Sequence, residues 1–108
     1  MLATETKPYQ GWTNYQTWAV KLWLDNEAPT YHLWRDRALE IRDIDETALT
    51  FINPYMDEDR RRVNQLAVEL EDWHREQMPE LNGFAADLME SALMEINWLE
   101  ISESLIEG

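Results

Sequence analysis

Apolar side chains recur every three or four positions along most of the chain, and this spacing constrains the fold more than any other feature. Near the start, Tyr15, Trp18 and Leu22 fall on one face of a helix with about 3.6 residues per turn. No segment alternates strongly between apolar and polar residues, and the chain has only three glycines. We therefore predict an all-α fold, a single compact bundle of about five to six helices with no sheet.

Capping residues and prolines set the expected bounds of these helices. Thr13 with Gln16 fits a capping box and Asn14 is an alternative cap, while Asp45 and Asn97 are suited to cap later helices. We expect residues 1–11 to be a loose lead-in and residues 12–108 to form one helical domain. The first four predicted segments are 12–26, a second helix that starts at Pro29 or Thr30 and ends at about Asp43, a short helix 46–52 with Leu49, Phe51 and Ile52 inward, and 57–77. The fifth is 84–95, with Phe84, Leu88, Ala92 and Leu93 on one face. The last helix starts from Asn97, with Trp98, Ile101 and Leu105 inward.

The composition fits a single globular domain, since 44% of the 108 residues are hydrophobic. The chain has no cysteine, which excludes disulfides, thiolate metal sites and cysteine nucleophiles. No apolar run approaches the roughly 20 residues that span a membrane, and the N-terminus has no apolar run of signal-peptide type. We therefore expect a cytoplasmic protein that does not act at a membrane.

Negative charge dominates the chain and is concentrated toward its end. Acidic residues outnumber basic ones by 22 to 9, giving a net charge of −13. Arg75 is the last basic residue, so residues 76–108 carry eight acids and no Lys or Arg. Such a field repels nucleic acid and attracts basic surfaces. The charge therefore predicts a basic partner and no direct binding of nucleic acid.

The acids of this last third are placed within predicted helices rather than in a tail. DNA carries one charge per about 1.7 Å of its axis, so carboxylates repeated along a helix imitate part of a phosphate backbone in sign and density. The alternative interpretation is that the charge serves only solubility. The candidate partner-binding residues are Asp87, Glu90, Glu95, Glu100, Glu103 and Glu107.

The aromatic residues near the N-terminus have two interpretations. A stripe of Trp at helical spacing is more often core than binding surface, and Tyr15 and Trp18 fit the core. Trp12 and Trp23 lie off this line, and Trp is enriched at interaction hot spots. We therefore keep Trp12 and Trp23 as a second candidate binding set, behind the acids.

Arg60-Arg61-Arg62 is the one basic cluster, and it also has two interpretations. It could contact a phosphate or a partner protein. We favour intrahelical ion pairs, because Asp57–Arg61 and Glu58–Arg62 both have the i,i+4 spacing with the acid first.

Patterns that would indicate catalysis or cofactor binding are weak or missing. Glu71 and His74 match one half of a di-iron Glu-x-x-His pattern, but Pro29 occupies the Glu position before His32. The three serines lack the flanking glycines of a nucleophile elbow, and no Gly-rich phosphate loop is present. We therefore predict no enzymatic activity, no catalytic residues, no metal site and no cofactor.

The segment GWTNYQTW at residues 11–18, followed by Leu22-Trp23-Leu24, resembles a family of short, largely uncharacterised proteins from phages, plasmids and bacteria with a GWTNYETW-type start. Gln16 stands where that motif has Glu, which keeps the capping role. The segment EINWLEI at 95–101 is similar to a second block of the family. The resemblance implies a mobile-element context and supplies no catalytic residues.

Small acidic helical proteins of mobile elements often inhibit host defence, and by this analogy we expect a phage or mobile-element inhibitor of a bacterial defence system. In this anti-CRISPR or anti-restriction hypothesis, the protein mimics nucleic acid and occupies a basic groove of a defence effector complex in the host cytoplasm. The alternative is a helical adaptor that binds a partner protein through its aromatic face. Salt sensitivity of binding distinguishes the two hypotheses. The sequence alone leaves the oligomeric state open.

Overall fold

The computed structural model describes residues 8–108, and these residues form helices without any β-strand. The predicted all-α fold is confirmed. Of the expected lead-in, residues 1–7 lie outside the described part, and Tyr9 and Trp12 form an isolated bridge across a turn. The elements are α1 (Tyr15–Asn26), α2 (Ala28–Asp43), the short 3₁₀ helix η2 (Glu46–Ala48), α3 (Glu58–Gln77), α4 (Gly83–Glu95) and α5 (Trp98–Glu107).

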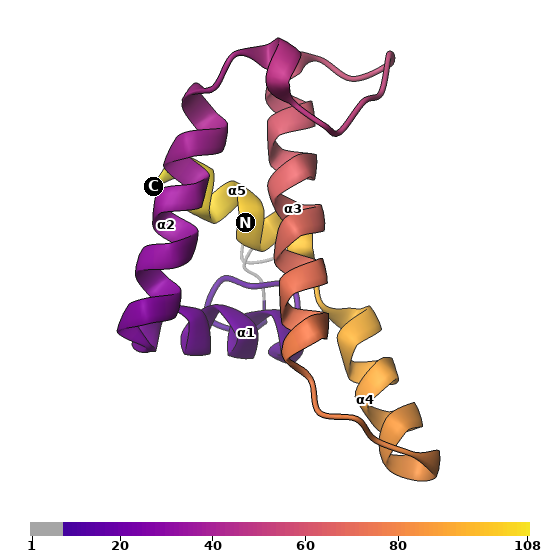
Figure 1. Ribbon diagram of the computed structural model, residues 1–108. Coiled ribbons are helices and arrows are strands. Elements are labelled where there is room, and N and C mark those ends of the chain that lie inside the picture. Colours follow the sequence, from indigo (N-terminus) through magenta and orange to yellow (C-terminus); the bar gives the residue numbers. More distant parts are fainter. Residues whose placement is uncertain (1–7) are drawn as a thin grey trace.

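Helices α2 and α3 are the two longest helices of the fold, and they pack against each other in antiparallel orientation (Figure 1). Helix α1 crosses near their lower ends, and α5 crosses between them and packs against both, most extensively against α3. Helix α4 extends away from this body beyond the lower end of α3 (Figure 1). It contacts α1, and its packing against the other helices is weak.

The hydrophobic core lies where α2, α3 and α5 meet. Burying each large apolar side chain contributes roughly 1.5–3 kcal/mol, so this region supplies most of the stability of the fold. The buried core includes Leu24 from α1, Trp34, Ala38 and Ile41 from α2, Leu66, Ala67 and Leu70 from α3, and Trp98 and Ile101 from α5. The inward positions predicted for Trp98 and Ile101 are confirmed, and Leu105 packs against the core as a partly buried residue.

Helix starts are capped largely as predicted. The predicted caps Asp45 and Asn97 each accept a hydrogen bond from a backbone N–H in the first turn. Asp57, for which no cap was predicted, does the same at the start of α3. At α1 the alternative cap is correct, because Asn14 rather than Thr13 accepts from the N–H of Thr17. The predicted capping box of Thr13 with Gln16 is therefore wrong.

The predicted helix at residues 46–52 is much shorter than expected. It ends at Ala48, and Ile52 is 80% exposed rather than inward, although Leu49 is buried. The reason is a contact from α3: Oε1 of Gln65 accepts hydrogen bonds from the backbone N–H groups of Thr50 (2.7 Å) and Phe51 (3.2 Å). These bonds hold the segment as a loop, because they take up N–H groups that a continuing helix would use.

The apolar face predicted for α4 is not buried as a unit. Leu93 is buried, but Phe84 is 79% exposed and Leu88 is 60% exposed. The helix forms where expected, yet its position at the edge of the bundle leaves one of its sides in solvent.

Candidate interaction site

Two polar side chains of the N-terminal motif, those of Asn14 and Thr17, reach across to the connection between α4 and α5. Oδ1 of Asn14 accepts from Oγ1 of Thr17 at 2.6 Å, and Nδ2 of Asn14 donates to the backbone carbonyl of Glu95 at 2.6 Å. Oγ1 of Thr17 accepts from the backbone N–H of Asn97 at 2.9 Å. The N-terminal motif therefore holds the connection between α4 and α5.

Residues at the start of α5 in turn bind the N-terminal motif. Asn97 caps α5 by accepting from the N–H of Glu100 at 3.1 Å, and Oε1 of Glu100 accepts from the backbone N–H of Thr13 at 3.1 Å. We call Thr13, Asn14, Thr17, Glu95, Asn97 and Glu100 the polar junction. It joins the two sequence blocks that carry the family resemblance, so these residues have a structural role.

The two aromatic candidates differ in exposure. Trp12 is partly buried and packs against the core, so it stabilises the fold. Trp23 is 67% exposed on α1, and its neighbour Leu22 is 40% exposed. Only Trp23 of this pair is accessible to a partner.

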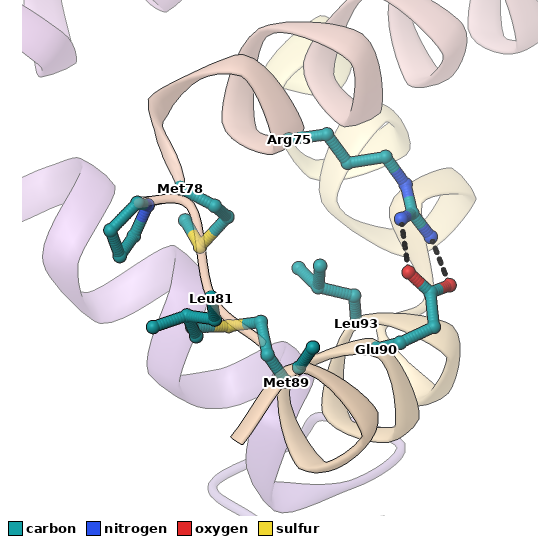
Figure 2. A pocket seen from close by; sticks show the side chains of 8 residues that line it. Arg75, Met78, Leu81, Met89, Glu90 and Leu93 are labelled. Carbon is teal, nitrogen blue, oxygen red and sulfur yellow. Dashed lines mark hydrogen bonds and ion pairs between the residues drawn. The ribbon is translucent and has the colours of Figure 1, made fainter. Parts of the chain in front are cut away.

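The acids of α4 have unequal surroundings. Glu90 forms a bidentate ion pair with Arg75 of α3, with N–O distances of 2.9 and 3.2 Å (Figure 2). Hydrogen bonding to this guanidinium holds the pKa of the Glu90 carboxyl below its usual value. Asp87 and the side chain of Glu95 are exposed, and within residues 8–108 neither forms an ion pair with a base.

The ion pair stands at the rim of a pocket between α4 and the end of α3. Met78 and Leu81 line it from the connecting segment, and Met89 and Leu93 line it from α4 (Figure 2). Its volume is about 210 Å³. The inner side of α4 is therefore incompletely packed, and the bond between Arg75 and Glu90 links the helix to α3.

The acids of α5 lie along one side of that helix, because Glu100, Glu103 and Glu107 are three and four residues apart. Glu100 belongs to the polar junction, and Glu103 lies 4.0 Å from Arg60 of α3. Glu107 is exposed, and in residues 8–108 no base pairs with it. The six candidate acids thus occupy two helices of different direction, and bases of α3 approach two of them.

Each arginine of the Arg60–Arg62 cluster has an acidic neighbour within the protein. Arg62 is buried, pairs with Glu58 as predicted, and donates to the carbonyl of Ile41 at 2.6 Å. Arg61 pairs with Glu46 at 2.9 Å. The predicted Asp57–Arg61 pair is wrong, because the Asp57 carboxylate caps α3 instead.

His74 is partly buried against aromatic side chains of α2, α3 and α5. Its ring stacks on Trp34 and contacts Trp73 and Trp98, and Nδ1 lies 2.7 Å from the carbonyl oxygen of Leu70. Burial lowers the pKa of His74. Across residues 8–108 no group of three or more His, Asp or Glu side chains is arranged to hold a metal ion.

The fold and these surfaces define a small all-α protein with a projecting helix that carries exposed acids. The chain belongs to a family of unknown function, DUF7249, whose model matches residues 5–99. No curated protein and no solved structure matches the chain. None of the helices in residues 8–108 is long and apolar enough to cross a membrane.

Sequence reasoning missed two features of this surface. The ion pairs from α3 to Glu90 and Glu103 connect residues far apart in the chain, and no local pattern indicates them. The role of Thr17 had a partial signal, since a Thr three residues after an Asn cap is placed to bond it. Its bond to Asn97 depends on tertiary packing alone.

Proposed function

We propose that the protein is a non-enzymatic inhibitor that works in the cytoplasm of a bacterial host by occupying a basic, nucleic-acid-binding groove of a defence complex. The observation that carries the proposal is the pair of exposed carboxylates of Asp87 and Glu95 on the projecting helix α4, with no base paired to either within residues 8–108. The net charge of −13 supports it, because a strongly negative protein is steered toward a basic surface.

The arrangement of the acids reduces the number of carboxylates that can imitate a phosphate backbone at the same time. Helices α4 and α5 differ in direction, so their carboxylates do not form one continuous row (Figure 1). The proposed contact is therefore short: Asp87 and Glu95 on α4, together with the α5 side that carries Glu103 and Glu107. Glu90 and Glu100 are excluded as contact residues, because Arg75 and the backbone of Thr13 already bind them.

The test is affinity purification from a bacterial host that carries several defence systems, followed by a salt titration of the captured complex. The double variant Asp87→Lys/Glu95→Lys is compared with Glu27→Lys/Asp36→Lys. The control residues are also exposed and form no ion pair within residues 8–108. Glu27 immediately precedes α2 and Asp36 lies on it, and any contact between α2 and α4 is weak.

Both double variants have the same net charge, so long-range steering is equal and only position differs. We expect the α4 variant to lose capture and inhibition while the control retains both, and we expect capture to weaken as salt rises. Binding that ignores salt, or that survives the α4 reversals, would refute the proposal.

A second candidate function is an adaptor that binds through an aromatic surface, and the 67% exposure of Trp23 is the observation that favours it. In that case Trp23→Ala abolishes capture while both charge variants leave it intact. Trp12→Ala is unsuitable for this test, because Trp12 packs against the core and its loss destabilises the fold.

A further inference from the structure

Helix α4 is unusually apolar for a helix that is so poorly covered. Eight of its thirteen residues are hydrophobic, yet only Leu93 is buried. A helix with apolar residues on several sides is normally enclosed by other elements. Here the inner side leaves the pocket of about 210 Å³ partly open, and the outer side meets solvent.

The solvent-facing side combines apolar and acidic groups. We define the α4 outer face as Phe84, Asp87, Leu88, Met94 and Glu95. Its three apolar side chains are 79%, 60% and 73% exposed, for Phe84, Leu88 and Met94 respectively. Its two acids form no ion pair within residues 8–108. Exposed apolar side chains grouped in this way mark interaction sites more often than isolated ones do.

Charge decides between the occupants that could cover this face. A second copy of the chain would bring its own net charge of −13 and the same acidic helix, so like charges would meet across the contact. A segment with apolar residues on one side and Lys or Arg beside them would bury Phe84 and Leu88 and pair with Asp87 and Glu95.

We infer that the α4 outer face docks a basic amphipathic helix of the partner protein. The inference rests on the proposed function for the positive charge of the partner, and it adds that apolar contact on α4, not charge alone, holds the complex. The mode is a helix laid against an apolar surface with flanking ion pairs.

The test uses a synthetic peptide of about 18 residues, or five helical turns, with Leu and Lys at amphipathic spacing. A peptide of the same composition in scrambled order is the control for charge. Binding to the full chain is measured by fluorescence anisotropy of the labelled peptide. Hydrogen exchange of the α4 amides then locates the bound peptide.

The variant is Phe84→Ser/Leu88→Ser, and its matched control is Ile52→Ser, which changes a side chain that is 80% exposed on the loop before α3. All three are exposed, so the variants keep the fold, and circular dichroism verifies this. We expect the α4 variant to weaken binding of the amphipathic peptide at least about tenfold and the control to change it less than about twofold.

Equal binding of the scrambled peptide, or unchanged binding by the α4 variant, would overturn the inference. So would sedimentation that shows a dimer dissolved by Phe84→Ser/Leu88→Ser, because the occupant would then be a second copy. The two proposals fail separately. If peptide binding depends on α4 but no defence complex is inhibited, the proposed function alone fails. If inhibition survives Phe84→Ser/Leu88→Ser but is lost in Asp87→Lys/Glu95→Lys, the inference alone fails.

Discussion

Replacing Thr17 by Val tests whether the polar junction holds the N-terminal motif to the start of α5. The side chains have nearly the same shape, and Thr17 is fully buried, so packing is preserved. The substitution removes the acceptor for the N–H of Asn97 and the donor to Oδ1 of Asn14. A partly buried N–H left without a partner costs about 1–2 kcal/mol, and the lost hydrogen bond costs about 1 kcal/mol.

Thr17→Val is therefore expected to lower the free energy of unfolding by about 2–3 kcal/mol. Thr17→Ser is the matched control, because it keeps the hydroxyl and removes one methyl group, at a cost of about 1 kcal/mol. For a domain of this size, the difference lowers the melting temperature of the Val variant roughly 10 °C below that of the Ser variant.

The assay is urea unfolding followed by tryptophan fluorescence, which the six Trp residues make sensitive. The double variant Asn14→Ala/Thr17→Val is expected to lose less stability than the two single variants added together, since both act on the same hydrogen bonds. A Val variant as stable as the Ser variant would refute the reasoning, because the hydroxyl would then contribute nothing.

Three further predictions concern other parts of the fold. Burial lowers the pKa of His74 below its ordinary value of 6.5, so as the pH falls the unfolded chain binds this proton before the folded chain does. The stability that depends on neutral His74 is therefore fully present above about pH 6.5 and is lost as the pH falls through the lowered pKa. Urea midpoints measured across this range should depend less on pH in His74→Phe than in the unchanged protein. Trp98→Phe should cost less than about 1.5 kcal/mol in urea unfolding, since Nε1 of Trp98 is buried without a partner in residues 8–108, and a cost near 3 kcal/mol would contradict this. Glu90→Gln removes the ion pair with Arg75 and should speed hydrogen exchange of the α4 amides while exchange in the core of α3 stays unchanged. Exchange of the α4 amides at the same rate in the variant and the unchanged protein would show that the pair does not hold the helix.

Much of the fold could be predicted because helix formation depends on neighbours three or four residues apart. The spacing of Trp98 and Ile101, and the caps at Asp45 and Asn97, are local features and were interpreted correctly. Errors arose where a distant residue intervened. Gln65 of α3 ends the helix expected at residues 46–52, because its side chain binds the backbone N–H groups that follow.

The candidate site was less predictable than the fold. The last third of the chain carries acids and no bases, but ion pairing depends on distance in space, and α3 brings Arg75 to Glu90 and Arg60 near Glu103. The exposure of apolar side chains on α4 could not be predicted from the sequence either. Phe84 and Leu88 have the spacing of a buried stripe, and only the projection of α4 from the bundle puts them in solvent.

The sequence by itself determined that the chain is helical, where most helices begin and end, and that its charge is strongly negative, because each of these follows from composition or from contacts within one helical turn. Only the tertiary structure decided which acids are paired, which apolar residues are buried, and that the N-terminal motif binds the start of α5. The bond between Thr17 and Asn97 joins residues 80 positions apart, and no local pattern specifies so distant a contact.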